Sequence, residues 1–212
     1  MSADVGAITL LTVQVALAST ALAGVLGVPA GLWLGERRTR FRRTFLVLTR
    51  TLYGLPPVLA GLFVFLLLSR AGPLGSLGLL FTPEAMVVAQ VLLLAPLLAG
   101  MVASAVASVD PLLGETARAV GASESQVRGM LLREIRRSLV GALMLAFGRA
   151  IGEVGAVIIV GGNIQSHTRV LTTAIVLETG RGDLQYAVLL GVILLALSAA
   201  TVLALTLWED RP

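Results

Sequence analysis

Five long apolar runs constrain this chain more than any other feature, because each is long enough to cross a lipid bilayer. A helix needs about 20 apolar residues to do so. The runs cover roughly residues 7–34, 45–69, 85–108, 138–161 and 184–208. Charged residues make up 13% of the chain, about half the share found in soluble proteins. This composition excludes a soluble enzyme, a nucleic-acid reader and a disordered chain. We therefore expect an all-α polytopic membrane protein with five transmembrane helices.

Arginine supplies all 16 basic residues and is distributed unevenly between the connections. Five arginines lie in residues 35–43, five in 110–137 and one at Arg211, whereas the connections on the opposite side hold Arg70, Arg169 and Arg181. Basic residues concentrate in cytoplasmic loops. The asymmetry predicts an N-terminus outside, a C-terminus inside and a cytoplasmic loop at residues 109–137.

Several kinds of functional site are excluded by what the sequence lacks. There is no cysteine, and the single histidine, His167, lies in a predicted loop, so we expect no metal site and no cofactor bound by this chain. No phosphate-binding GxxxxGK[ST] motif occurs, and no loop exceeds about 30 residues, which leaves no room for a nucleotide-binding domain. We expect no enzymatic activity, so a partner protein or an ion gradient must supply the energy.

The cytoplasmic loop at residues 109–137 carries the start and stop signals of two short helices. Asp110 suits the N-cap and the following proline suits the first helical position. Gly121 can adopt the left-handed conformation that ends a helix. Ser123 and Gln126 have the spacing of a capping box, which starts the second helix. The loop is predicted to place a short helix across the mouth of the bundle, followed by a sharp turn.

The second and fourth spans contain residues that a plain lipid-facing helix would avoid. Pro56 and Pro57 remove two amide donors and should kink or break the second span, which suits a helix lining protein or water. Arg149 and Glu153 lie in the fourth span, and each charge costs about 2.5–3.5 kcal/mol at mid-membrane. Their i, i+4 spacing allows them to pair on one helical face. They form either a structural salt bridge or the border of a water-filled path or gate.

Small residues at four-residue spacing predict close helix packing. Gly148, Gly152 and Ala156 share this spacing on the fourth span, and Gly27 and Gly31 repeat it on the first.

The outer loop at residues 162–183 contains one moderately apolar stretch, Val170–Leu177, that is too short to span the membrane. It predicts an interfacial helix or a re-entrant lip near an outer gate. Arg169 and Arg181 of this loop either meet acidic residues of an external protein or remain solvated.

The stretch Glu115-Thr-Ala117-x3-Gly121 resembles the EAA-x3-G signature of ABC importer permeases, on the loop where that family carries it. The fourth-span stretch RAIGE, residues 149–153, is similar to the RAxGE of oxyanion permeases. Residues 54–63, 66–75, 148–163 and 168–176 look like segments of the tungstate permease family, and the resemblance extends over residues 8–207.

The resemblance implies one ABC importer transmembrane domain over residues 8–207, in the prokaryotic plasma (inner) membrane. It implies that Glu115, Ala117 and Gly121 form a coupling helix for a separate ATPase subunit, which uses the ATP. It also implies a homodimer, an extracytoplasmic substrate-binding protein and an oxyanion substrate, with tungstate as the first expectation. Arg149, Glu153 and Asn163 are then candidates for the translocation pathway or gate.

Three alternatives remain open from the residues. Molybdate or another oxyanion could replace tungstate, because tungstate and molybdate are near-identical in size and charge. A self-sufficient secondary carrier or channel could use Arg149 and Glu153 as a relay, although the sequence has no obvious inverted repeat. A non-transporting membrane scaffold would have no need for charges at mid-span.

Overall fold

The computed structural model describes residues 2–36, 44, 47–49, 51–52 and 54–209. The arginine-rich loop at 37–43 and the second-span charge Arg50 lie outside these residues. The described part is all-helical, as predicted. Its elements are α1 (Ser2–Glu36), α3 (Pro57–Leu68), η1 (Gly75–Leu77), α4 (Pro83–Ser108), α5 (Pro111–Ala119), α6 (Glu124–Glu134), α7 (Arg136–Ile151), α8 (Gly155–Gly161), α9 (Leu171–Arg181) and α10 (Leu184–Glu209).

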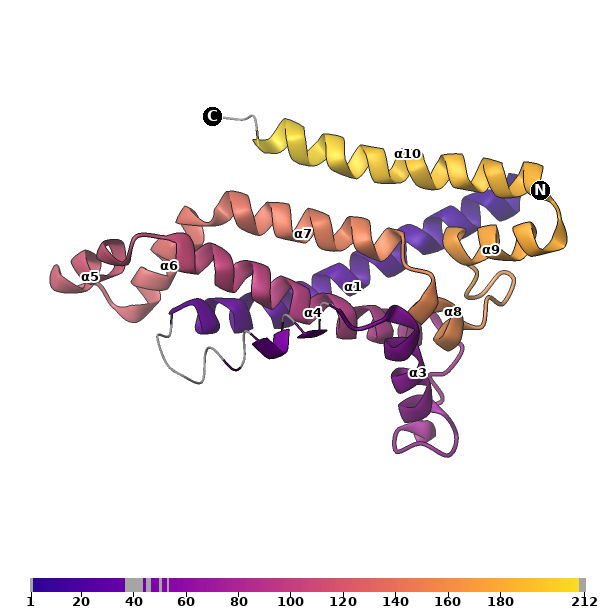
Figure 1. Ribbon diagram of the computed structural model, residues 1–212, viewed down its shortest axis with the longest axis horizontal. Helices are drawn as coiled ribbons and strands as arrows, with labels where there is room; N and C mark the ends of the chain where they lie inside the picture. The colour runs from indigo at the N-terminus through magenta and orange to yellow at the C-terminus, as the bar shows by residue number, and fades with distance from the viewer. Residues whose placement is uncertain (1, 37–43, 45–46, 50, 53, 210–212) are drawn as a thin grey trace.

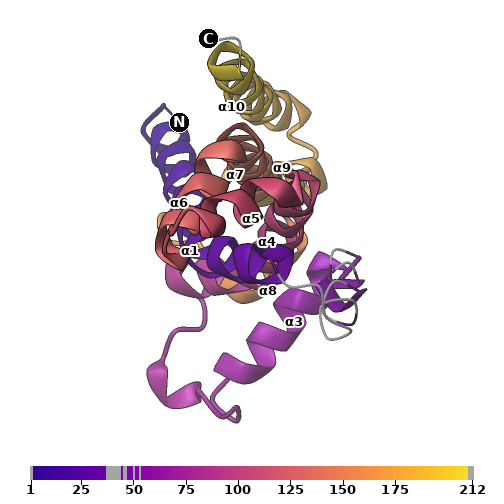
Figure 2. The ribbon, with the colours of Figure 1, turned by 90° about the vertical axis from the view of Figure 1, so that its left-hand side faces the viewer.

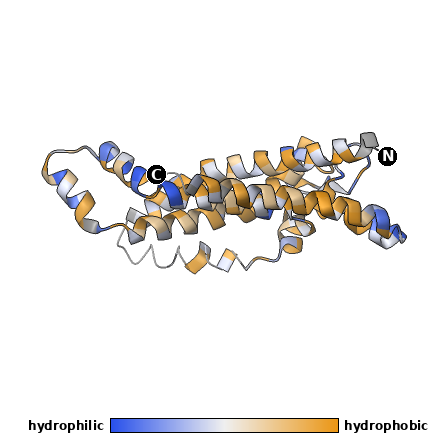
Figure 3. Cartoon of the chain, turned by 90° about the horizontal axis from the view of Figure 1, so that it is seen from above, coloured by the Kyte–Doolittle hydropathy of each residue, from blue (hydrophilic) through white to orange (hydrophobic). Residues whose placement is uncertain are grey.

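The long helices α1, α4, α7 and α10 run along one axis, with α5 and α6 at one end of the bundle and the N-terminus and α9 at the other (Figure 1). Hydrophobic residues dominate along the helices, whereas hydrophilic residues gather at the two ends (Figure 3). Such a distribution is that of a protein whose middle lies in lipid.

The described residues contain three helices that are long and apolar enough to cross a membrane, at Val5–Gly35, Pro83–Ser108 and Leu184–Trp208. The fourth expected span is present as a pair, α7 and α8, that bends by 56° at a short break. The second expected span differs more, because its apolar helix α3 has 12 residues and begins after the break at Pro56–Pro57. By length and composition, the described residues therefore contain up to four helices that could cross a membrane, when the bent pair is counted as one.

Close packing of α1 on α4 forms the largest contact between two helices of the bundle. A methyl group at Gly27 would lie 2.7 Å from the Ala95 carbonyl oxygen, and one at Gly31 would lie 2.6 Å from the Ala99 carbonyl oxygen. Since both partners advance by four residues in the same direction, the two helices are parallel. The backbones approach this closely because glycine has no side chain, as the spacing on the first span predicted.

The glycines of the fourth span do not pack in this way. A methyl group at Gly148 would meet no atom within 4 Å, and one at Gly152 would make ordinary contacts with its own helix. The third member of the predicted face, Ala156, is buried and lies against Gly61 of α3. Within the subunit Gly148 and Gly152 therefore meet no neighbouring helix, because the bend between α7 and α8 divides the predicted face between two helices.

The helix α3 starts at the two prolines expected to break the second span. Pro56 is the N-cap of α3, and Pro57 occupies the start of the helix, where no amide donor is required. From there α3 runs away from the bundle (Figure 2). Its base remains attached through α8, where a methyl group on Gly155 would come within 2.9 Å of the Val58 side chain.

The α1–α4 packing predicts that Gly31→Ala lowers the melting temperature of the purified protein in detergent. The added methyl group must displace the Ala99 carbonyl and the Val102 side chain, and overpacking of this kind costs about 1–3 kcal/mol. Gly6→Ala is the matched control on the same helix, because a methyl group there meets no atom within 4 Å. Equal melting temperatures for the two variants, measured by scanning fluorimetry, would contradict the account of this interface.

Candidate functional site

The α5–α6 element at one end of the bundle is built by three local capping interactions. The Asp110 side chain accepts a hydrogen bond of 2.9 Å from the Leu112 amide, which caps α5. Gly121 follows the helix with φ of +90°, in the left-handed region that favours glycine. Ser123 and Gln126 exchange two hydrogen bonds in a capping box, which starts α6. The local structure predicted for this loop is confirmed.

The three residues of the EAA-x3-G stretch occupy different environments. Glu115 and Gly121 are exposed. Ala117 is buried, and its carbonyl oxygen accepts a hydrogen bond of 3.0 Å from the Ala122 amide, which closes the turn. Gly114, one turn earlier on α5, lies over the buried Val127 of α6. Small residues on the inner face therefore keep α5 close to α6, while the outer face remains available for a partner.

Two apolar side chains that the sequence analysis did not select lie on the outer side of α5. Val120 is 81% exposed and Leu112 is 62% exposed, at the opposite ends of the helix. Their signal in the sequence is weak, because isolated exposed aliphatic residues are common on protein surfaces. Together with Glu115 they give the helix a mixed apolar and acidic surface.

An ion pair joins the two helices of this element. The Arg118 Nε donates to the Glu124 Oε1 at 2.7 Å, and a second guanidinium nitrogen donates to Oε2 at 3.2 Å. These hydrogen bonds from Arg118 lower the pKa of Glu124 below its ordinary value. The ion pair bridges the turn between α5 and α6.

The fourth span is broken at Gly152–Val154, with one of its two charged residues before the break and the other within it. Glu153 is buried, and its Oε1 accepts a hydrogen bond of 3.1 Å from the Ala156 amide at the start of α8. Arg149, on the last turn of α7, is exposed on the surface of the subunit. The structure records no ion pair between them among the residues it describes. This geometry disfavours the salt-bridge alternative for the two charges, because the helix does not continue from Arg149 to Glu153.

Arg149 borders a hollow of about 370 Å³ between α4, α7 and α10. Gly148, Ser198 and Thr201 also line it, together with apolar side chains. The two hydroxyl groups donate to carbonyl oxygens of their own helix, Ser198 to Leu194 and Thr201 to Leu197, both at 3.0 Å. The guanidinium of Arg149 is therefore the charged group in the lining of this hollow, and the other lining residues are apolar or weakly polar.

Gln90 is a buried polar residue next to the break that the sequence analysis missed. It lies on α4 and lines a small crevice together with Arg149 and Glu153. Its amide group contacts α1 through Ser19 and α7 through the Ala150 carbonyl oxygen. The sequence did contain a signal for this residue, because a single glutamine within a 26-residue apolar helix indicates a buried polar contact.

Asn163 lies in the loop between α8 and α9 rather than beside Arg149. Its backbone is left-handed, with φ of +52°, and its Nδ2 donates to the Thr173 carbonyl oxygen at 3.3 Å. The hydrogen bond to Thr173 attaches Asn163 to α9. The neighbouring residue of α9, Thr172, donates to the Glu153 carbonyl oxygen at 2.8 Å, so α9 connects Asn163 to the break. The structure thus brings Arg149 and Glu153 to one crevice and places Asn163 on the connection above it.

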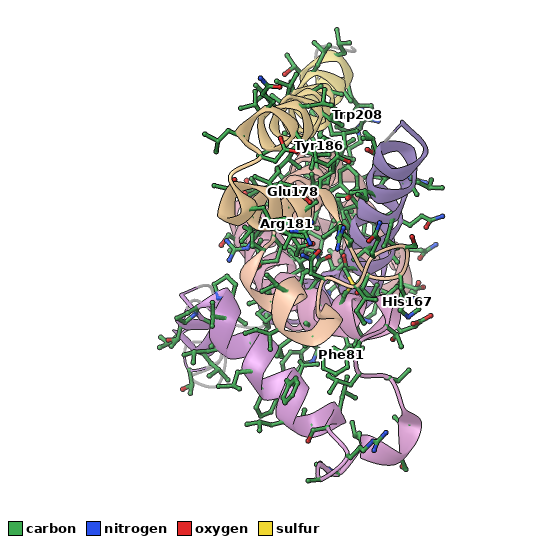
Figure 4. The ribbon with its side chains drawn as sticks, turned by 90° about the vertical axis from the view of Figure 1, so that its right-hand side faces the viewer. Phe81, His167, Glu178, Arg181, Tyr186 and Trp208 are labelled. Carbon is green, nitrogen blue, oxygen red and sulfur yellow. The ribbon has the colours of Figure 1, made fainter. Side chains whose placement is uncertain are left out.

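The apolar stretch predicted at Val170–Leu177 forms most of α9, with Leu171 to Ala174 buried. Arg181 pairs with Glu178 of the same helix at 3.2 Å, so it is partly neutralised within the chain. This pair lies on α9, at the end of the molecule that carries the N-terminus (Figure 1) and that faces the viewer in Figure 4. Among the described residues no three His, Cys, Asp or Glu side chains form a group that could hold a metal ion.

A family model for the inner membrane component of binding-protein-dependent transport systems matches residues 27–211. The chain belongs to this family. It is therefore an ABC importer permease subunit, and its predicted location in the inner membrane is confirmed.

Two curated relatives and one solved structure agree with this assignment. The chain is 44% identical to a probable anion ABC transporter permease of Haloferax volcanii, over 90% of this chain and 84% of the relative. It is 40% identical to the tungstate uptake system permease TupB of Peptoclostridium acidaminophilum, over 91% and 85%. A chain of the MetNI methionine ABC transporter, solved in inward-facing conformations, shares the fold with a TM-score of 0.80 at 21% identity, over 97% of this chain and 94% of that one.

Proposed function

We propose that this chain is the membrane subunit of an ATP-driven importer for an oxyanion, with tungstate as the first candidate. Residues 8–207 form its transmembrane domain. The observation that carries the proposal is the α5–α6 element, a capped helix and sharp turn at one end of the bundle. The names of the two relatives, an anion permease and a tungstate permease, support the substrate class. The chain itself binds no ATP and performs no catalysis.

The proposed complex contains two copies of this chain, two ATPase subunits and a substrate-binding protein outside the membrane. Each ATPase docks on the exposed side of α5, at Glu115 and Gly121, with Ala117 holding the helix on α6. The arginine asymmetry supports a cytoplasmic position for this element and an outer position for α9.

The geometry of α6 and α7 supplies a path for mechanical coupling. A single residue, Ile135, separates the two helices, and its amide donates to the Leu131 carbonyl oxygen at 3.0 Å. The Ile135 carbonyl oxygen in turn accepts a hydrogen bond of 2.8 Å from the Leu139 amide. Helical hydrogen bonding therefore continues from the docking element into the membrane. A displacement of α5 is carried along α7 to the break at Gly152–Val154.

The three pathway candidates of the sequence analysis receive separate roles in this proposal. Arg149 lies about 20 Å along α7 from Arg136, roughly two thirds of the way across the hydrocarbon core. A charge at that depth must face water or protein, so Arg149 borders the anion pathway between two copies of the chain. Glu153 caps α8 at the hinge, and Asn163 holds the outer loop to α9.

Molybdate transport is the closest alternative, because the two oxyanions present the same charge and nearly the same size to Arg149. A self-sufficient secondary carrier is less well supported, since Arg149 and Glu153 do not form the pair that a relay within one span would use.

The coupling role predicts that Gly121→Val abolishes tungsten accumulation in cells that lack the chromosomal gene. A β-branched residue at φ of +90° is strained by about 1–2 kcal/mol and should distort the turn after α5. Gly129→Val on α6 is the control, because a methyl group there meets no atom within 4 Å. Cellular tungsten and molybdenum are measured by mass spectrometry at nanomolar supply.

We expect the wild type and Gly129→Val to restore tungsten, and Gly121→Val to restore neither tungsten nor capture of the ATPase. Full activity of Gly121→Val would contradict the coupling role. Equal loss of molybdenum on gene deletion would broaden the substrate to both oxyanions.

The pathway role predicts that Arg149→Gln lowers the rate of tungstate uptake at least tenfold, a barrier increase of about 1.4 kcal/mol. Arg149→Lys keeps the positive charge and should retain most of the rate. Both variants must capture the ATPase as the wild type does, which controls for assembly. An unchanged rate for Arg149→Gln would remove this residue from the pathway.

A further inference from the structure

Gln90 is the one polar residue of α4 between Glu84 and Ser104, and it is 3% exposed. An amide buried in an apolar environment without partners costs several kcal/mol. Within a bilayer no water is available to compensate for missing partners. A glutamine at this position therefore needs hydrogen-bond partners from the protein, and the identity of these partners shows which helices it connects.

The side chain of Gln90 joins three helices. Its Oε1 accepts a hydrogen bond of 2.5 Å from the Ser19 hydroxyl on α1. Its Nε2 donates to the Ala150 carbonyl oxygen, in the last turn of α7, at 3.0 Å.

The carbonyl that Gln90 contacts belongs to the break in the fourth span. In an unbroken helix the Ala150 carbonyl would accept from the amide four residues later. Here the chain turns away, and the Glu153 amide reaches it at 3.3 Å, three residues later. Gln90 supplies a further donor at this point, so it compensates for the helical hydrogen bond that the break removes.

The opposite side of the break is held by α9. The Thr172 hydroxyl donates to the Glu153 carbonyl oxygen at 2.8 Å, and the neighbouring Leu171 amide donates to the Thr12 hydroxyl on α1 at 2.9 Å. Gln90 and Thr172 thus bind the backbone of the break from two sides. Gln90 is itself hydrogen-bonded to α1, and Thr172 follows a residue whose amide is hydrogen-bonded to α1.

We infer that Gln90 is a positioning residue that locks the broken fourth span against the α1–α4 pair in one transport state. This inference rests on the proposed function. Motion carried along α7 from the docked ATPase ends at Ala150, where the hydrogen bond from Gln90 must release for the break to move. Loss of that bond should let the break move without substrate, so ATP is hydrolysed without a matching gain in uptake.

The test uses the complex of the permease, its ATPase and the substrate-binding protein in proteoliposomes. ATP hydrolysis is measured with and without tungstate-loaded binding protein, and the ratio of the two rates reports coupling. Gln90→Met keeps the length of the side chain but removes both hydrogen bonds. We expect it to raise the basal rate and to lower the ratio at least fivefold.

Ser19→Ala is the matched control, because it removes the Ser19–Gln90 hydrogen bond and leaves the donor to Ala150 in place. We expect its ratio to stay near that of the wild type. If Gln90→Met does not assemble, Gln90→Asn keeps the amide but shortens its reach to Ala150, and it should lower the ratio in the same way. A side chain with a merely structural role would lower both rates and the melting temperature together and would leave the ratio unchanged.

An unchanged ratio in both Gln90 variants would overturn the inference while leaving the proposed function intact. Absence of stimulation by loaded binding protein in the wild-type complex would instead overturn the proposed function.

Discussion

The parallel packing of α1 on α4 is the interaction on which the rest of this structure depends. Glycines 27 and 31 let the two backbones approach to a distance that any side chain would prevent. In lipid such contacts replace the hydrophobic effect as the source of helix association, because hydrocarbon solvates apolar side chains as well as a neighbouring helix does. The pair forms a rigid frame against which α7, α8 and α9 are placed. Since its two helices are parallel, the chain between them must return along the length of the bundle.

Polar groups in the membrane are few, and nearly all those near the break serve to hold it. Glu153 caps α8, Gln90 binds the end of α7, and Thr172 binds the backbone between them. Each of these groups finds its partner inside the subunit. Arg149 differs because its side chain faces the surface of the subunit, beside glycines that no neighbour covers. In the proposed mechanism, the hydrogen-bonded inner groups therefore belong to the hinge, and the outward-facing Arg149 belongs to the pathway.

The sequence predicted local structure well wherever the signal lies within a few residues. Asp110, Gly121 and the Ser123–Gln126 pair defined both helices of the cytoplasmic loop, and Pro56–Pro57 located the break before α3. The fourth span was harder to predict from the sequence, because i, i+4 spacing places two residues on a shared face only when the helix is continuous. The bend removed that condition and left Arg149 and Glu153 in different environments. Gln90 could not be assigned a role from sequence, since its partners are 71 and 60 residues away along the chain.

The proposed function requires that this chain moves an oxyanion only when a partner hydrolyses ATP. Uptake of tungstate into proteoliposomes containing the permease and its ATPase, with the loaded binding protein on the opposite side of the membrane, tests this most directly. We expect uptake when ATP is supplied to the ATPase and none when ATP is absent or the ATPase is omitted. Uptake driven by an ion gradient through the permease alone would contradict this requirement and would identify a self-sufficient carrier.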